Sequence, residues 1–394
     1  MANSNKPSVV LSIPWELYKK GGVNTVVKDL ISQFVLPDSP YNVILHINNW
    51  QKKTNDDNKE YEVIRIPTTD ISCCNTYAKK IKYLFIQKPK MYFQWYRVIK
   101  KHNVQVINVH FPTANVLSLL NICKLFKIRL VFSFHGADID QLHITTTEKA
   151  LKYFSRLVYR IVVCSLSMKE RLIKKSSLYS EKIVVIPNGI DSEKIKNYSF
   201  PINENKSLIN PYFVNIGTFE PKKGQDILIH AFQLLNENYP VHNHQLVFIG
   251  RQTEYLMELK NLVNQLGLSD RIVFYTDLSH KHVMQILSKA ELFLLPSRDE
   301  PFGLALLEAG LLNIPIMAHA VGGVKEIISP DYDGILITEN TALVWYQQLV
   351  RFLKNEHEIN CLIENFSTTI DKRFSSKVVF SSYIKLFHQV ESIS

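Results

Sequence analysis

The sequence predicts an α/β protein that consists of two doubly wound domains, each built on a parallel β-sheet. Short apolar runs rich in β-branched residues alternate along the chain with longer helical patterns, as in successive βαβ units. The apolar runs do not have a polar residue at every second position, and this continuity is expected of strands that are buried on both faces. A polar stretch at 192–210 interrupts the pattern, and no strand or helix is predicted across it.

The predicted strands fall into two groups, one on each side of this break. Helical patterns lie between most of them, for example at 23–34. The first group is 9–13, 42–47, 61–66, 104–109, 129–134, 160–165 and 182–187. The second group is 212–217, 245–250, 271–276, 291–296 and 314–319. Ligands of such sheets bind at the carboxyl ends of the strands, so the cleft between two such domains is the expected site.

The composition is that of an ordinary globular protein, with 46% apolar and 21% charged residues. The N-terminal stretch 1–22 does not resemble a signal peptide, because its apolar run is short and charged residues soon follow. The longest apolar region, 303–321, is interrupted by polar residues, so no membrane-spanning segment is expected. Five cysteines without zinc-binding spacing, two of them the adjacent Cys73 and Cys74, fit a reducing cytoplasm.

The stretch SRDEPFGLALLEAG places two carboxylates near the start of a predicted helix. The strand 291–296 ends just before it, and Pro301 excludes a helix through the residue that precedes it. The helix is therefore expected to begin near Gly303, with Glu300 in the loop and Glu308 about one and a half turns into the helix.

The start of this helix should attract an anion, because its first backbone N–H groups are free and lie at the positive end of the helix dipole. Two carboxylates beside a phosphate would repel it, so they are expected to accept hydrogen bonds from hydroxyl groups instead. A nucleoside diphosphate sugar has phosphates between two hydroxylated sugars and would suit both features. By its spacing alone, the pair could also be two ordinary surface acids.

The segment 296–310, together with 315–328 and 333–336, resembles the donor-binding half of retaining glycosyltransferases of the GT-B fold. The family is the glycosyl transferases group 1, also called family four, and the resemblance covers nearly the whole chain. It implies that Glu300 contacts hydroxyls of the donor sugar and that Glu308 holds the ribose.

The resemblance also implies roles for backbone groups beside these carboxylates. The amides of Phe302, Gly303 and Leu304 would face the sugar and the diphosphate. Gly322 and Gly323 match the family's Gly-Gly-x-x-Glu turn, to which we assign a mainly structural role.

A second motif, at 215–232, places Lys223 at the start of another predicted helix, where a cation is unfavourable unless an anion is bound. The stretch is similar to the family pattern Gly-Arg-x-x-Pro-x-Lys-Gly, which implies that Lys223 binds the donor diphosphate. Thr218 stands where the family commonly has a second phosphate-binding group, an arginine. Lys222 or a backbone group is the expected replacement.

Three motifs of the first half also resemble the family. Gly21 and Gly22 match a glycine pair that lies under the donor phosphate, and KKGGV is similar to the Lys-x-Gly-Gly-Leu of glycogen and starch synthases. His135 follows a buried strand and matches a His-Gly whose histidine contacts the reacting sugar. Nearby Asp138 is either structural or on the acceptor side. Asn188 and Asp191, in VVIPNGID, are expected to shape a turn.

No metal or other cofactor is expected. Asp138 and Asp140 form an Asp-x-Asp like the pair that binds Mn²⁺ in GT-A transferases, but the GT-B resemblance argues against that interpretation. The helix dipole and Lys223 would instead stabilise the leaving diphosphate.

The resemblance implies a retaining hexosyltransferase that moves a sugar from a nucleoside diphosphate sugar to a glycan or lipid-linked acceptor, in cell-surface polysaccharide or glycolipid synthesis. Residues 1–200 would bind the acceptor, 201–375 would bind the donor, and 376–394 would pack back on the first domain. Glu300, His135 and Lys223 would be catalytic. The alternatives are a nucleotide-sugar epimerase of the same fold and a catalytically silent partner subunit. The oligomeric state is left open.

The net charge of +10 is concentrated in the first half, since residues 1–200 carry +15 and residues 201–394 carry −5. No acidic residue occurs between Asp70 and Asp138, and the segment 77–101 combines eight basic residues with seven aromatic ones. Its aromatic residues could simply fill a core. We expect instead that the segment contacts an anionic membrane surface, so that the protein is peripheral at the cytoplasmic face of the membrane. Nucleic acid is not expected as a partner, because no nucleic-acid-binding motif accompanies the charge.

Overall fold

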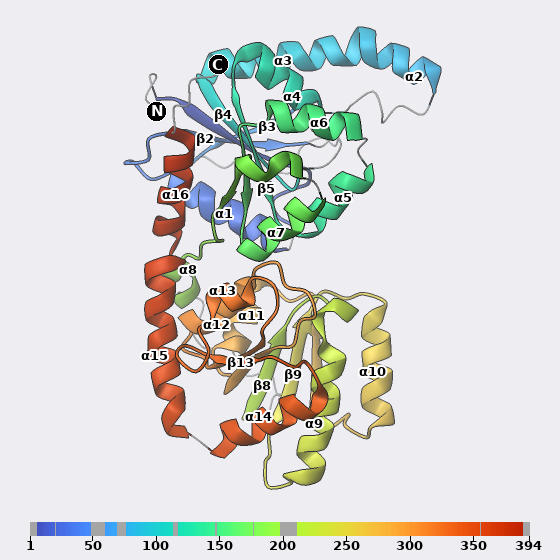
Figure 1. Ribbon diagram of the computed structural model, residues 1–394, viewed down its shortest axis with the longest axis vertical. Helices are drawn as coiled ribbons and strands as arrows, with labels where there is room; N and C mark the ends of the chain where they lie inside the picture. Colours follow the sequence, from blue (N-terminus) through green and yellow to red (C-terminus); the bar gives the residue numbers. More distant parts are fainter. Residues whose placement is uncertain are drawn as a thin grey trace. The chain divides into compact units, whose positions relative to one another are not determined.

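The computed structural model describes residues 6–19, 21–48, 60–68, 76–112, 117–145, 148–175, 177–197, 211–354 and 356–388, so Cys73 and Cys74 lie outside the described residues. The chain divides into two compact units (Figure 1). Unit 1 comprises residues 1–189 together with 379–394, and unit 2 comprises residues 190–378.

Unit 1 is built on a parallel sheet of seven strands in the order β3-β2-β1-β4-β5-β6-β7 within the described residues. The seven predicted strands of the first half are all confirmed. They are β1 (Ser8–Ile13), β2 (Asn42–Ile47), β3 (Glu62–Arg65), β4 (Val104–His110), β5 (Arg129–Phe134), β6 (Arg160–Val163) and β7 (Ile183–Val185).

The helices of unit 1 follow the strands in the alternation that the sequence predicts. They are α1 (Gly22–Phe34), α2 (Tyr77–Lys82), α3 (Lys88–His102), α4 (Leu117–Phe126), α5 (Ala137–Thr145), α6 (Glu148–Leu157) and α7 (Leu166–Lys175). A π-helical turn, η2 (Tyr83–Gln87), joins α2 to α3, and a 3₁₀ segment, η4 (Ser177–Lys182), precedes β7.

Unit 2 has a parallel sheet in the order β10-β9-β8-β11-β12-β13. Its strands are β8 (Tyr212–Ile216), β9 (Gln245–Gly250), β10 (Ile272–Thr276), β11 (Leu292–Leu295), β12 (Ile316–His319) and β13 (Ile335–Ile337). Its helices are α8 (Ser192–Lys196), η5 (Pro221–Lys223), α9 (Gln225–Asn238), α10 (Tyr255–Gln265), α11 (His280–Leu287), α12 (Leu304–Leu311), α13 (Val324–Ile327), α14 (Ala342–Lys354) and α15 (Glu356–Arg373). The three-residue edge strand β13 was not predicted.

The strand order reverses once in each sheet, between β1 and β4 in unit 1 and between β8 and β11 in unit 2. At such a point the loops that leave the two central strands run to opposite faces of the sheet and open a crevice between them. In unit 2 these loops carry Lys223 and Glu300, so the topology alone brings the two predicted motifs together.

The first residues of the polar stretch 192–210 form a short helix, α8, that the sequence analysis did not predict. Asp191 begins this helix, because its side chain accepts a hydrogen bond from the Lys194 N–H at 3.1 Å. Ile190 pairs with Ser375 in a parallel bridge within unit 2, so the boundary between the units falls at 189/190 rather than at 200. Residues 198–210 lie outside the described part of the chain.

The last helix, α16 (Ser376–His388), belongs to unit 1 from Val379 onward. The ring of Phe380 lies 4.8 Å from that of Phe34 on α1, edge to face. Arg129 and the Tyr41 hydroxyl both donate to the carbonyl oxygen of Phe387, which satisfies an acceptor of the helix's last turn.

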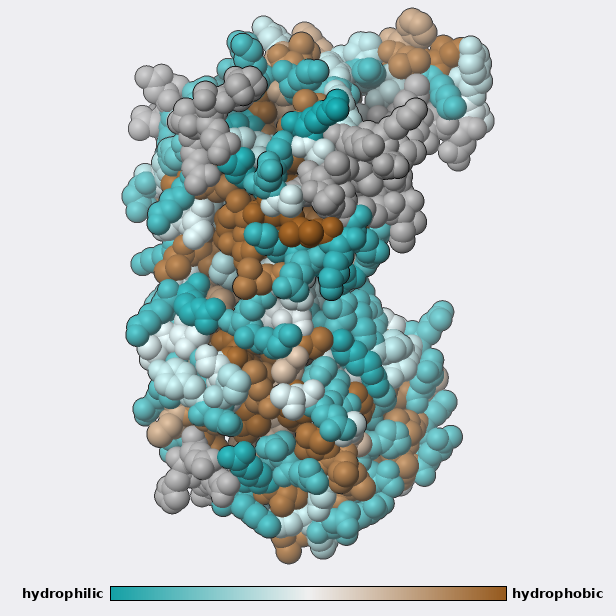
Figure 2. Space-filling view, in the orientation of Figure 1, coloured by the Kyte–Doolittle hydropathy of each residue, from teal (hydrophilic) through white to brown (hydrophobic). Residues whose placement is uncertain are grey.

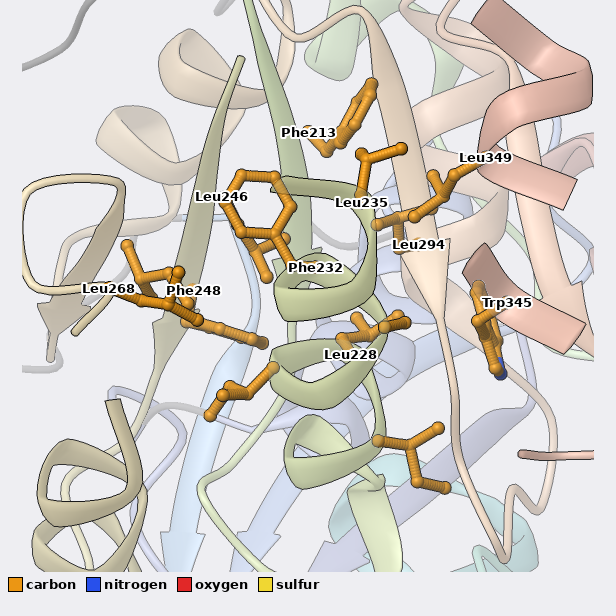
Figure 3. Close-up of a cluster of buried hydrophobic side chains, with 14 of the residues drawn as sticks. Phe213, Leu228, Phe232, Leu235, Leu246, Phe248, Leu268, Leu294, Trp345 and Leu349 are labelled. Atoms are coloured by element: carbon orange, nitrogen blue, oxygen red, sulfur yellow. The ribbon is translucent and has the colours of Figure 1, made fainter. Parts of the chain in front are cut away.

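Aromatic and aliphatic side chains between the sheet and α9 and α14 form the core of unit 2 (Figure 3). Trp345 on α14 is fully buried in it, and its indole N–H donates to the Asn340 side chain at 2.8 Å. Asn340 in turn donates to the carbonyl oxygen of Pro296 at 2.9 Å. The core therefore directly fixes the end of β11, where the loop that carries Glu300 begins.

We predict that Trp345→Ala lowers the free energy of unfolding of unit 2 by about 3–5 kcal/mol, because it leaves a large cavity and an unpaired Asn340. Leu343→Ala on the same helix is the matched control, since Leu343 is 55% exposed, and it should change stability by less than about 0.5 kcal/mol. Urea unfolding followed by circular dichroism measures both. Equal effects of the two substitutions would contradict the assigned core.

Candidate active site

The loop that follows β11 turns into α12 through Gly303, whose φ of 108° is unfavourable for any residue with a side chain. No side chain caps the start of this helix, so the amides at 302–304 are available to a ligand. The Gly-Gly turn at 322–323 packs against this loop and holds it in place. The Gly323 N–H donates to the Glu300 carbonyl oxygen at 3.0 Å. A Cβ on Gly322 would lie 2.0 Å from the same oxygen, which supports the structural role assigned to this turn.

Lys223 and Glu300 form an ion pair across the point where the strand order of unit 2 reverses. The ammonium nitrogen of Lys223 lies 2.7 Å from Oε2 of Glu300, and the side chains are only 19% and 10% exposed. The Ser297 hydroxyl donates to the same carboxylate oxygen at 3.1 Å. Two residues that the sequence placed in separate motifs are therefore in direct contact beside the start of α12.

The loop that carries Lys223 packs tightly on the loop that carries Glu300. Lys223 ends the short helix η5, and Gly224 follows with a φ of 69° before α9 begins. A Cβ on Gly224 would lie 2.1 Å from the carbonyl oxygen of Pro296, so only glycine permits this approach.

Arg298 joins the two loops on their exposed side. Its guanidinium group donates to both carboxylate oxygens of Asp226, at 2.8 and 2.6 Å, and to the carbonyl oxygen of Pro221 at 2.6 Å. Its backbone N–H donates to the Lys222 carbonyl oxygen at 2.7 Å. Burial raises the pKa of Asp226, but the hydrogen bonds and charge of Arg298 outweigh this and hold that pKa below its usual value. The sequence analysis did not predict these contacts of Arg298.

Glu308 is nearly buried, and its carboxylate pairs with a histidine that the sequence analysis also missed. Oε1 of Glu308 lies 2.8 Å from Nε2 of His280, the first residue of α11. The histidine side chain is 39% exposed and that of Glu308 is 12% exposed. Glu300 and Glu308 are therefore not ordinary surface acids, since each accepts a hydrogen bond at a polar, partly enclosed position.

Other predicted donor-binding residues lie on these loops with different partners. The ammonium group of Lys222 pairs with Glu220 at 2.6 Å. The carbonyl oxygen of Thr218 accepts a hydrogen bond from the side chain of Gln225 at 3.1 Å. The ring of Phe302 is buried against Phe374, so this residue can offer a ligand its backbone N–H but not its side chain.

Gly21 and Gly22 lie in unit 1, at the start of α1, where the loop from β1 ends. A Cβ on Gly21 would meet no atom within 4 Å. The preceding loop is anchored by Glu16, which pairs with Arg65, and by Trp15, whose ring lies 4.8 Å from that of Phe111 beyond β4.

His135 follows β5 in unit 1 and is half-buried beside a second histidine, the fully buried His110, at the end of β4. Nε2 of His135 lies 3.1 Å from Nδ1 of His110, and Nε2 of His110 lies 3.2 Å from the Asn108 side chain. Burial lowers the pKa of His135 to about 4, and burial together with His135 lowers that of His110 well below its usual value. Both rings are therefore neutral at pH 7.

Asp138 holds the turn that follows β5, and its partners differ from those of Asp140. Its carboxylate accepts hydrogen bonds from the backbone N–H groups of His135 and Gly136, at 2.7–3.0 Å. Burial raises the pKa of Asp138 to about 7, although these N–H groups act in the opposite direction. Asp140 instead pairs with Arg171 and Lys175.

Neither a metal cluster nor a membrane-spanning helix is found in the described part of the chain. No group of three or more His, Cys, Asp or Glu side chains there could hold a metal ion. No described helix is both long enough and apolar enough to cross a bilayer.

Known proteins resemble this chain in sequence and in fold. Residues 20–194 match the model of Glycosyltransferase Family 4, and residues 199–367 match that of Glycosyl transferases group 1. The N-acetyl-alpha-D-glucosaminyl L-malate synthase of Bacillus anthracis is 23% identical over 307 residues, 74% of this chain and 77% of the relative. A UDP-Gal:alpha-D-GlcNAc-diphosphoundecaprenol alpha-1,3-galactosyltransferase of Escherichia coli is 23% identical over 304 residues, 74% of this chain and 76% of the relative.

Among solved structures, Anabaena HepE in complex with UDP and glucose matches with a TM-score of 0.73 at 17% identity, over 97% of this chain and 99% of that chain. The chain belongs to the group 1 glycosyltransferases, and its two parallel-sheet units are those of the GT-B fold. The chain is therefore a glycosyltransferase by family, and the candidate site in unit 2 lies within the residues that the group 1 model matches.

Three histidines of unit 1 that are neutral at pH 7 predict a dependence of stability on pH. His46 resembles His110 and His135, because burial lowers its pKa to about 4 although the Ile66 carbonyl oxygen opposes this. Below pH ~6.5 the unfolded chain binds protons that the folded chain does not, so the unfolding free energy falls as the pH drops from ~6.5 to ~4. Asp138 has the opposite effect, because its raised pKa lets the folded chain bind a proton that the unfolded chain does not bind in this pH range. Three histidines outweigh this single carboxyl group, so the net effect is a loss of stability.

Urea unfolding at several pH values, followed by tryptophan fluorescence, tests this expectation. His46→Gln removes one of the three groups and should make the dependence shallower by at most about 1.4 kcal/mol per pH unit. His230→Gln, an exposed position on α9, is the control and should leave the slope unchanged. A wild-type protein that gains stability between pH ~6.5 and ~4 would contradict the assigned neutral state.

Proposed function

We propose that this protein is a retaining hexosyltransferase that uses a nucleoside diphosphate sugar as donor. The observation that carries the proposal is the Lys223–Glu300 ion pair beside the uncapped start of α12. A lysine ammonium group and free helix amides together suit a diphosphate. A carboxylate that is already fixed by Ser297 suits sugar hydroxyls.

In the proposed complex, the donor diphosphate takes over the ammonium group of Lys223 and so releases Glu300 to the sugar. The amides at 302–304 and Lys223 then stabilise the charge that develops on the leaving diphosphate. Glu300 would then position the sugar and stabilise positive charge at the anomeric carbon. The acceptor hydroxyl attacks the same face of the sugar, and a leaving-group oxygen takes its proton, so no separate protein base is needed.

Glu308 is the proposed partner of the donor ribose, and its contact with His280 supports this role. In the free protein the carboxylate accepts a hydrogen bond from the imidazole, and a ribose hydroxyl could take the place of that donor. No metal ion has a part in this proposal, because Lys223 and the helix start supply the positive charge. Lys222, whose ammonium group is paired with Glu220, is the proposed second phosphate contact in place of the arginine that Thr218 replaces.

We further propose that unit 1 binds the acceptor, a glycan or a lipid-linked sugar, and that the protein works as a peripheral protein at the cytoplasmic face of the membrane. His135 would lie near the reacting sugar there as a neutral group. The similarity to an Escherichia coli galactosyltransferase whose name includes a diphosphoundecaprenol acceptor supports this proposal. A role in cell-surface glycan synthesis would follow.

Thermal shift with UDP-, GDP- and ADP-sugars tests the donor class, because a ligand that binds only the folded state raises its stability by RT ln(1 + [L]/Kd). One base should give a clearly larger shift than the other two. The anomeric configuration of the product, read by NMR, then tests retention. The absence of a shift with every nucleotide sugar would contradict the proposed donor.

We predict that Glu300→Gln lowers turnover by roughly 100-fold or more, a loss of about 3 kcal/mol, because it removes a charge next to a cationic transition state. Nucleotide binding should change little. Asp299→Asn is the matched control, since it removes an exposed carboxylate one residue away and should keep wild-type turnover. Wild-type turnover in the glutamine variant would exclude the role assigned to Glu300.

Lys223→Ala should weaken binding of a nucleoside diphosphate by about 2 kcal/mol or more, the scale of a lost charge-assisted hydrogen bond. The preference for diphosphate over monophosphate should shrink with it, and calorimetric titration measures both ligands. Lys222→Ala is the matched comparison, with a smaller expected loss because Lys222 is already paired with Glu220. An unchanged diphosphate preference in Lys223→Ala would show that this lysine only stabilises the loop.

A further inference from the structure

The helix formed by α2, η2 and α3 projects from unit 1 beyond α4 and α6, with α2 at its free end (Figure 1). α2 has no buried residue, and η2 buries only Tyr83. α3 buries Met91, Trp95 and Ile99, so this part of the helix is anchored in the unit.

The projecting end exposes an unusual number of apolar side chains. Of the sixteen large apolar side chains that are exposed in the described residues, seven lie within the twenty residues 77–96. Tyr77 is 81% exposed, Phe85 77%, Phe93 61% and Ile86 60%. An exposed apolar patch on a single element of a globular protein usually marks a contact surface.

This observation divides the aromatic residues of the segment into two groups. Tyr83 and Trp95 fill the core of unit 1, as the simpler interpretation of the sequence requires. Tyr77, Phe85, Phe93 and Tyr96 do not, because they are exposed. Core packing therefore explains only part of the segment.

The same segment is strongly basic and has no acidic residue. It carries Lys79, Lys80, Lys82, Lys88, Lys90, Arg97, Lys100 and Lys101. Among the described residues, ion pairs of this segment involve only Lys101, with Glu62. Figure 2 shows brown apolar atoms next to teal polar atoms on the projecting helix.

We propose that this surface, formed by α2, η2 and the exposed side of α3, docks on a bilayer rich in anionic phospholipid. Exposed aromatic and aliphatic side chains enter the headgroup layer, while the lysines pair with lipid phosphates. A protein partner would match the apolar residues equally well, but the uninterrupted positive charge favours an extended anionic surface. The inference rests on the proposed peripheral location and adds the surface that makes the contact.

Flotation with lipid vesicles tests the surface on the 394-residue chain. Wild-type protein should bind vesicles that contain phosphatidylglycerol and should not bind pure phosphatidylcholine. Binding should fall at least about tenfold between roughly 0.05 M and 0.5 M salt, because the Debye length shrinks severalfold over this range. Protein that stays unbound with anionic vesicles at low salt would overturn the proposal.

Two variants separate the apolar contribution from the charged one. Phe85→Ser with Ile86→Ser should weaken binding about tenfold or more, from the lost burial of two large side chains. Replacing Lys79, Lys80, Lys82, Lys88 and Lys90 together by Gln should weaken it by roughly 100-fold or more. The control is Val241→Ser with Met257→Ser, which removes two exposed apolar side chains of unit 2 and should leave vesicle binding unchanged.

Wild-type binding by the Phe85/Ile86 variant would show that apolar side chains do not enter the bilayer, and would overturn the inference. The same proteins are assayed for thermal shift with nucleotide sugars, which reports on unit 2. A normal thermal shift without vesicle binding contradicts the docking surface and the peripheral location, and leaves the proposed donor standing. Vesicle binding without any shift contradicts only the proposed donor.

Discussion

The ion pair between Lys223 and Glu300 is the interaction on which the account of this protein depends. It joins the two loops that leave β8 and β11, and both side chains are largely removed from solvent. Burying an ion pair is costly, and apolar residues at such positions often give equal or greater stability. The ligands that the proposed function assigns to the two groups therefore explain the pair better than a contribution to folding does.

The scaffold around the pair leaves it little freedom. Gly224 and Gly322 let the neighbouring backbones approach more closely than any side chain would permit. Arg298 ties the loops together from outside, and Trp345 fixes the end of β11 through Asn340. A site whose supports are this closely packed is preorganised, so less free energy is lost in ordering it when a ligand binds.

Most of the fold could be predicted from the sequence, because each long apolar run carries its own signal of a strand buried on both faces. β13 was missed because a three-residue strand is too short for a periodic pattern, and α8 was missed because its apolar content is low. Glu300, Glu308 and Lys223 were found from local motifs. Their partners Ser297 and His280 were not found, nor was Arg298, which joins the two loops through Asp226, since these contacts depend on how the loops meet in three dimensions. Phe85 and Trp95 differ in exposure although both are aromatic, and only the structure shows which face of the helix is covered.

A crystal structure with a bound nucleoside diphosphate sugar tests the central claim most directly. The account predicts that the diphosphate lies against the amides of 302–304, with the Lys223 ammonium group turned from Glu300 to a phosphate oxygen. The carboxylate of Glu300 should then accept hydrogen bonds from hydroxyls of the sugar. A nucleotide bound elsewhere in unit 2, with the Lys223–Glu300 pair still intact, would contradict the account.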